Sequence, residues 1–322
     1  MAPMKSELGG GGAGFSRYVA GKKRAAYGGE EGARYAYAAD VAMLNAFRRM
    51  KPVELAASST VRMYKDVYKN QLLGTTIKVT ERQFPSIYSI ARECAETLDV
   101  AVPQVYITNS PVVNAYTFGT NDDAFIVVHS ALVDHFDADE LKFVIGHETG
   151  HIQNKHVIYN TVLILLKTAA SFLRYLMPPA EVALQAWYRR AEVTCDRAGL
   201  LCCGDLEAAS RTFLKMACGS KKLYEELDVD EYLNQADEGR EGIGRLTELF
   251  ASHPYLPKRI EAMRVFGESE LYRRAIGAGE DGLTMEQVDD RTHEIIRIVK
   301  AHKTHQAEQA EKSEDEEDSS VD

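Results

Sequence analysis

Two histidines and a glutamate lie close together near the middle of the chain, as His147, Glu148 and His151. On an α-helix, residues four apart lie on one face, about 6 Å from each other, so both imidazoles can reach one metal ion. The carboxylate of Glu148 would then lie beside the metal and could take a proton from a water molecule that the metal activates. The H-E-x-x-H spacing therefore predicts a single Zn²⁺ per chain and the chemistry of a zinc hydrolase.

The residues around this motif argue against the alternative of a surface helix with two solvated histidines. Phe143, Val144 and Ile145 precede the motif directly and indicate a buried helix, in which a histidine pair without partners would be costly. Gly150 in a helix interior costs about 1 kcal/mol relative to alanine. A glycine at this position is easier to explain if another backbone or a ligand must come close.

A catalytic zinc site needs three protein ligands and one open position. One source of the third ligand is a histidine six residues after the second, as in H-E-x-x-H-x-x-G-x-x-H. This chain has Asn154 at the glycine position and Val157 at that histidine position. His156 is one residue out of register, so we interpret it as a surface or packing histidine.

A carboxylate from a later helix is the other source of the third ligand. Glu192 and Asp196 are four residues apart, so a helix would place both on one face. Glu192 can complete a His₂Glu site, and Asp196 can accept the second ring N–H of a liganding histidine and fix its tautomer. Glu181 is an alternative ligand, although the first turn of a helix after two prolines already explains a glutamate there. Cys195 lies on another helical face and is not expected to be a ligand.

Taken together, these residues resemble the HtpX and type I CAAX-prenyl-protease family of zinc metallopeptidases, within the gluzincin group. The shared motifs are H-E-x-G-H and the later R-x-x-E-x-x-x-D. Three further segments agree, in the order that the family has: Asn114–Gly119, Phe125–Val133 and Ser252–Ile260. The resemblance covers roughly residues 80–265.

The resemblance implies a role for each residue that matches a motif of the family. These roles are zinc binding by His147, His151 and Glu192, general-base catalysis by Glu148, support from Asp196 behind the ligands, substrate-backbone binding by Asn114, oxyanion stabilisation by His253, and site support by Arg259. From the residues alone, His253 is only a histidine at a loop-to-helix junction, and a capping or packing residue is the alternative for it.

One departure from the family concerns the membrane. HtpX and the prenyl proteases are integral membrane enzymes, whereas the N-terminal part of this chain has no apolar run. Residues 156–177 are apolar but carry Asn160, Lys167 and Arg174, and a charged side chain near a bilayer centre costs several kcal/mol. The pattern favours a buried or interfacial helix over a membrane span, and hence a soluble branch of the family.

Composition narrows the classes of partner and compartment. The net charge is −10, and the segment 308–322, with eight acids and one lysine, carries most of it. The remainder is nearly neutral, which argues against a nucleic-acid partner. Five cysteines without a C-x-x-C pair and no secretory signal favour a reducing compartment, so we expect a cytoplasmic protein. The alternative is a protein peripheral to the inner face of a membrane.

The chain divides by composition into a flexible Gly-rich arm over residues 1–35, a zinc metallopeptidase domain over 36–300, and an acidic disordered tail over 301–322. The predicted fold class is α+β, mostly helical: a zincin-like core with a small sheet packed on the catalytic helix. We expect strands over 74–80, 104–108, 115–118 and 124–129, with a turn at Asn121–Asp123. The catalytic helix should begin at Asp137 or Asp139 and end near Lys155, and a helix capped by Thr80 should run through Leu98. Later helices are expected over residues 221–234 and 241–250.

The best-supported function is a zinc-dependent endopeptidase acting on peptide or unfolded protein. No G-x-x-x-x-G-K-[ST] loop is present, so an ATP-driven motor is not expected. A non-catalytic zinc-containing binding or scaffold protein is one alternative, although a structural site would be closed by four ligands. A membrane-surface protease that uses 157–177 as an in-plane helix is the other.

Overall fold

The computed structural model describes residues 32–50, 73–168, 178–229 and 256–297, with residues 59, 61, 70, 231 and 232. The side chains of 164–181 are outside the description. Several sequence predictions therefore fall outside it: the arm up to residue 31, the second half of the 157–177 segment, the Glu181 side chain, a helix over 241–250, His253 and the acidic tail.

A four-stranded sheet forms one layer, made of β1 (Thr76–Lys78), β2 (Gln104–Thr108), β3 (Ala115–Gly119) and β4 (Ala124–His129), in the order β1-β2-β4-β3. β2 and β4 run parallel, whereas β1 and β3 pair antiparallel with their neighbours. The predicted turn between β3 and β4 is confirmed, because Gly119 pairs with Ala124 across it. Within the described sheet, β3 is therefore an edge strand.

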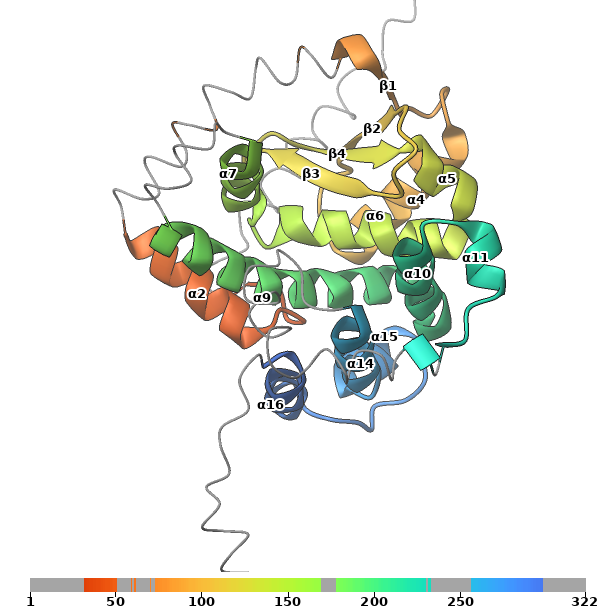
Figure 1. The fold of residues 1–322 in the computed structure, drawn as a ribbon. Coiled ribbons are helices and arrows are strands. Elements are labelled where there is room, and N and C mark those ends of the chain that lie inside the picture. The colour runs from red at the N-terminus through yellow and green to blue at the C-terminus, as the bar shows by residue number, and fades with distance from the viewer. Residues whose placement is uncertain are drawn as a thin grey trace, which may run out of the picture.

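Helices make up the rest of the described fold, which confirms a mostly helical α+β class. They are α2 (Ala38–Arg49), α4 (Pro85–Thr97), α5 (Ser130–His135), α6 (Ala138–Gln153), α7 (Val157–Thr168), α9 (Pro178–Cys203), α10 (Leu206–Cys218), α11 (Lys221–Glu225), α14 (Leu256–Gly267), α15 (Glu270–Ala275) and α16 (Met285–Ile296). Helix α6 lies between the sheet on one side and α9 on the other (Figure 1). Apolar residues of the inner sheet face, such as Ile126 and Val128, share one core with Val144 and Ile145 of α6.

The start of α6 follows from a capping box. The Asp137 side chain accepts hydrogen bonds from the backbone N–H groups of Asp139 and Glu140, and Glu140 accepts from the Asp137 N–H in return. Of the two predicted starting residues, Asp137 is therefore the cap. The box satisfies donors that a helix N-terminus otherwise leaves open.

Glycines let α6 and α9 approach closely. A Cβ atom added to Gly150 would lie 2.7 Å from Ala198 Cβ and 3.3 Å from Cys195 Cα. One added to Gly146 would lie 2.6 Å from Cys202 Cβ. A neighbouring backbone is thus the reason for Gly150 inside a helix, as its cost in helix propensity suggested.

Arg197 of α9 is 1% exposed and contacts residues from both the N-terminal and the C-terminal parts of the described structure. Its guanidinium donates to the Tyr35 carbonyl oxygen at 3.1 Å, to Asp289 at 2.7 Å and to Thr292 at 3.2 Å. Tyr35 precedes α2, whereas Asp289 and Thr292 belong to α16. The residues around α2 and those of α16 are therefore held to the central helix by one buried cation.

Two helix predictions are wrong in their limits. The helix expected from Thr80 begins only at Pro85, because a residue before proline is kept out of the helical region and Phe84 adopts a left-handed φ of 60°. The helix expected over 221–234 ends at Glu225, since Asp228 accepts a hydrogen bond from the Glu231 N–H and so caps a new turn. Of the helices that the structure describes, none has the length and apolar character needed to cross a membrane.

Candidate active site

Two imidazoles from α6 and one carboxylate from α9 converge at the crossing of these helices. His151 Nε2 lies 3.4 Å from Glu192 Oε1, and His147 Nε2 lies 3.8 Å from Glu192 Oε2. All three residues are buried, with exposures of 8% for His147 and 1% for each of the others. The H-E-x-x-H pair and the later glutamate are therefore brought together, although His151 and Glu192 are 41 positions apart in the sequence.

The donor set fits a zinc ion. Nitrogen and oxygen ligands about 2.0–2.2 Å from a tetrahedral zinc are roughly 3.3–3.6 Å apart, close to the separations observed here. Imidazole and carboxylate are both donors that zinc accepts. Both histidines direct Nε2 to Glu192, so the same ring atom of each is available to one cation.

Asp196 and Arg259 lie behind this trio. Asp196 Oδ1 is 3.0 Å from His147 Nδ1, so the carboxylate can accept the second ring proton of that histidine. Arg259 from α14 donates to Asp196 through Nε at 2.8 Å and Nη2 at 2.5 Å, and its Nη1 is 3.0 Å from Glu192 Oε2. One guanidinium thus contacts both carboxylates.

Electrostatics favour a proton on His147 when no metal is bound. Burial would lower the pKa of His147, but the carboxylates of Glu192 and Asp196 outweigh it and raise the pKa to about 10. Burial lowers the pKa of His151, in spite of Glu192 and Glu148 nearby. The pocket is therefore set up for one positive charge among its carboxylates.

Glu148 faces the sheet. Its Oε2 accepts a hydrogen bond from the Thr117 hydroxyl of β3 at 2.6 Å, and both residues are buried. Thr117 was not among the predicted site residues. The alternation of side chains along a strand is a signal for it. Residues two apart share a face, so Thr117 and Ala115 lie on the face opposite Tyr116.

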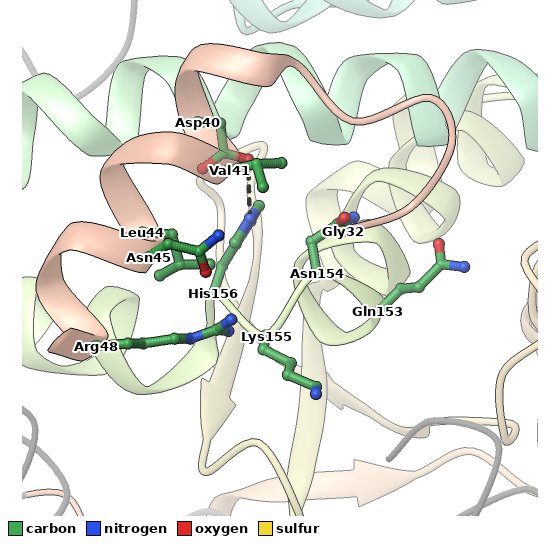
Figure 2. Close-up of a pocket in the computed structure, with 10 residues that line it drawn as sticks. All are labelled: Gly32, Asp40, Val41, Leu44, Asn45, Arg48, Gln153, Asn154, Lys155 and His156. Carbon is green, nitrogen blue, oxygen red and sulfur yellow. Dashed lines mark ion pairs between the residues drawn. The ribbon is translucent and has the colours of Figure 1, made fainter. Parts of the chain in front are cut away.

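His156, which we interpreted as a surface or packing histidine, lies next to the second histidine of the motif. It is completely buried, and its Nδ1 lies 3.2 Å from His151 Nδ1. Its Nε2 lies 3.0 Å from Oδ2 of Asp40 in α2, the contact marked in Figure 2. Burial alone would raise the pKa of Asp40, but His156 and the hydrogen bonds to the carboxylate outweigh it and lower the pKa.

Cys195 lies closer to the histidines than its position on α9 suggested. One ligand atom each of His147, His151 and Cys195 lie within 4.8 Å of one another. The thiol is 3.6 Å from His156 Nδ1, which itself lies 3.2 Å from His151 Nδ1. Burial raises the pKa of Cys195 well above its usual value, which keeps the thiol protonated.

Asn114 is half-buried and directly precedes β3, three residues before Thr117. Its carbonyl oxygen accepts the His129 N–H at 3.0 Å and so begins the β3–β4 ladder. Because hydrogen-bonded pairs alternate in an antiparallel ladder, Ala115, Thr117 and Gly119 turn their main-chain groups away from β4. Helix α7 meets two of these residues: Asn160 Nδ2 lies 3.4 Å from Thr117 O, and Thr161 Oγ1 lies 3.2 Å from Gly119 N.

A comparison with protein families matches residues 81–266 of the chain to the family described as Peptidase family M48. This span contains the residues from α6, α9 and α14 that meet at the site, but not Asp40.

The chain is similar to a protein of Arabidopsis thaliana named plastoglobule-localized metallopeptidase 48, chloroplastic, with 34% identity over 169 residues, which are 51% of this chain and 49% of that protein. It is also similar to a protease HtpX homolog of Streptococcus pneumoniae, with 30% identity over 97 residues, which are 30% of this chain and 32% of that protein. The chain therefore spans about half the length of the plant relative and about a third of the bacterial one. No solved structure matches the chain.

Proposed function

This chain belongs to peptidase family M48, and we propose that it hydrolyses peptide bonds as a zinc-dependent endopeptidase with Glu148 as the general base. The observation that carries the proposal is the meeting of two Nε2 atoms with one carboxylate, at 3.4 and 3.8 Å. In this proposal His147, His151 and Glu192 hold the ion. Zinc would supply Lewis acidity, lowering the pKa of a neighbouring water towards 7 and polarising the substrate carbonyl.

Glu192 is a better third ligand than Cys195. Its carboxylate faces both Nε2 atoms, and Arg259 holds it in that position. The Cys195 thiol instead lies 3.6 Å from His156 Nδ1, a ring atom that contacts His151 through its Nδ1. A His₂Glu set leaves a fourth position for solvent and substrate, as a catalytic site requires and a scaffold site does not.

Glu148 would move the protons of the reaction. Its carboxylate would accept a proton from the attacking water and deliver it to the leaving amide nitrogen. The hydrogen bond from Thr117 keeps Oε2 in place and leaves Oε1 for this transfer. His253, three residues before the start of α14, would stabilise the oxyanion, and the contact of Arg259 with Glu192 and Asp196 brings the start of α14 to the site.

The substrate would pair in extended form with β3 at Ala115, since α7 already contacts the outward main-chain groups of Thr117 and Gly119. Ala115 presents its main-chain groups at the open edge, between Asn114 and the base-contacting Thr117. Pairing of this kind recognises extended main chain and not particular side chains. It fits a peptide or an unfolded protein as the substrate, with Asn114 holding the backbone at one end.

The decisive experiment compares Glu148→Gln with the wild type. The variant should retain one zinc per chain by elemental analysis and lose hydrolysis of an unfolded protein by at least about a hundredfold, the smallest usual contribution of a general base. Asp139→Asn is a matched control, since it removes the same charge from an exposed position of the same helix. Activity retained by Glu148→Gln would refute the base, and a wild type without zinc or hydrolysis would refute the enzyme in favour of a scaffold.

Location is a separate proposal. All five cysteines are free thiols, which fits the cytoplasm or the inner face of a membrane. The plant relative, in contrast, is named as chloroplastic and plastoglobule-localized. Fractionation of cells that contain the full chain separates a cytoplasmic enzyme from a surface-bound one.

A further inference from the structure

The two proposed histidine ligands differ in what holds their Nδ1 atoms. His147 Nδ1 meets a carboxylate directly, at Asp196 Oδ1. His151 Nδ1 meets a second imidazole, His156, which in turn meets the carboxylate of Asp40. Figure 2 shows His156 directed at Asp40 from the segment after α6. The second arrangement uses a residue pair that the H-E-x-x-H motif does not contain.

The protonation of His151 determines which atoms carry the protons in the contacts from His151 through His156 to Asp40. A histidine that binds a cation through Nε2 keeps its remaining ring proton on Nδ1. His151 therefore donates, and His156 must accept through an unprotonated Nδ1, which is 3.2 Å away. The proton of a neutral His156 is then on Nε2, which lies 3.0 Å from Asp40 Oδ2. The His151–His156 contact then has one donor and one acceptor, and the protonated Nε2 of His156 faces the Asp40 carboxylate as a close polar contact without the geometry of a regular hydrogen bond.

Two further residues hold Asp40 in place. Trp187 Nε1 donates to Oδ1 at 2.9 Å, and the Thr194 hydroxyl donates to Oδ2 at 2.7 Å. Thr194 Oγ1 in turn accepts the Tyr37 N–H at 3.1 Å, which commits the hydroxyl proton to Asp40. A carboxylate only accepts hydrogen bonds, so this buried end sets the polarity of the whole chain of contacts.

We propose that Asp40 and His156 are positioning residues that hold His151 with its proton on Nδ1 and its Nε2 directed to the metal. The inference rests on the proposed function, because it takes His151 to be a zinc ligand. Asp40 belongs to α2, which precedes the family-matched span of residues 81–266. The metal site is thus completed by a helix from outside that span.

Zinc affinity of the full chain tests the proposal, measured in competition with a chromophoric chelator. Asp40→Asn and His156→Leu should each weaken zinc binding by about 10–100-fold, the usual loss when a partner behind a ligand is removed. His156→Gln should stay within about threefold of the wild type, because its amide oxygen can accept from His151 and its amide N–H can donate to Asp40. Rescue by glutamine and not by leucine separates hydrogen bonding from packing.

Asp289→Asn controls for loosening of α2. Asp289 accepts from the Ala38 N–H at 2.9 Å and from Arg197 at 2.7 Å, so it also anchors this helix, but its contacts do not include His151 or His156. This variant should bind zinc within about twofold of the wild type. Its unfolding temperature without metal shows how much of any effect comes from stability alone.

Proton NMR of the zinc-loaded protein provides a readout that activity does not influence. The His151 Nδ1–H should give a slowly exchanging signal in the wild type and in His156→Gln, and exchange rapidly in His156→Leu. Unchanged zinc affinity in both Asp40→Asn and His156→Leu would overturn the positioning role, as would a His156→Gln variant as weak as the leucine variant. A wild type that binds no zinc would overturn the proposed function itself, so the two failures are distinct.

Discussion

The hydroxyl of Thr117 donates a hydrogen bond to Glu148 Oε2 at 2.6 Å, and the same oxygen of Thr117 lies 3.1 Å from the Glu148 carbonyl oxygen. The edge strand β3 and the helix α6 therefore meet at the residue proposed as the base. The strand that would pair with a substrate also orients the carboxylate that would act on it. Substrate binding at β3 and proton transfer by Glu148 would therefore both depend on the position of Thr117.

Thr117→Val should lower kcat by about tenfold or more, because a hydrogen bond to a charged group contributes about 1.5–3 kcal/mol. Valine keeps the branched shape of threonine and a place in the strand, and zinc content should not change. Thr117→Ser, which keeps the hydroxyl, should stay within about threefold of the wild type. Steady-state hydrolysis of an unfolded protein measures both variants, and equal rates in valine and serine variants would contradict the role of the hydroxyl.

Arg259→Met should lower the free energy of unfolding of the metal-free protein by about 3–5 kcal/mol, since two buried carboxylates lose their cation. Arg291→Met is the exposed comparison. Arg291 pairs with Glu268 at 3.1 Å with both side chains more than half exposed, and its loss should cost less than about 1 kcal/mol. Urea unfolding measures both. Similar values for the two variants would show that Arg259 does not act as a buried counter-ion.

Gly150→Ala should weaken zinc binding and lower stability by about 1–3 kcal/mol, because the added Cβ would lie 2.7 Å from Ala198 Cβ and α9 must move. Moving α9 displaces Glu192 from the histidines. Gly267→Ala is the control, since its Cβ would make an ordinary contact of 3.5 Å with Leu206. Chelator competition and urea unfolding should leave that control near the wild type; a tolerated alanine at 150 would show that the helices adjust.

The metal-free protein should lose stability as the pH rises from about 6.5 to about 10. The pKa of His147 is raised to about 10 in the folded state, against about 6.5 when unfolded. The folded state therefore binds the proton more tightly, and the stabilisation is complete below pH 6.5 and lost on passing pH 10. Urea unfolding of wild type and His147→Gln between pH 6 and 10 isolates this contribution as their difference. A difference independent of pH would contradict it.

Periodicity and capping rules predicted the elements that carry the H-E-x-x-H motif. The strands over 104–108 and 124–129 and the Asp137 cap agree with the structure, because each depends on local residue types. The helix expected from Thr80 was wrong because Pro85 overrides a plausible cap. Capping and periodicity therefore predicted an element correctly where no residue such as Pro85 imposed a different backbone conformation.

The meeting of Asp40 with His156 could not be predicted in the same way. The two residues are 116 positions apart in the sequence, and no spacing rule connects a residue of α2 with a residue after α6. The register of His156 relative to the motif shows only that it cannot be the third ligand, and it carries no information about the partner of His151 Nδ1. The sequence predicted that Cys195 and Glu192 lie on different faces of α9. It did not predict that Gly150 lets α6 approach Cys195 closely.

The guanidinium of Arg197 has a practical consequence for anyone who expresses part of this protein. Tyr35, Asp289 and Thr292, which its nitrogens contact, all lie outside residues 81–266. A recombinant fragment cut at those limits would keep every motif residue yet lose the partners of Arg197 and expose the apolar surface around Trp187 that Leu44 and Phe47 of α2 cover, which is destabilising. Truncation boundaries should be drawn before Gly32 and after Arg297, and a fragment that aggregates says nothing about whether the enzyme is active.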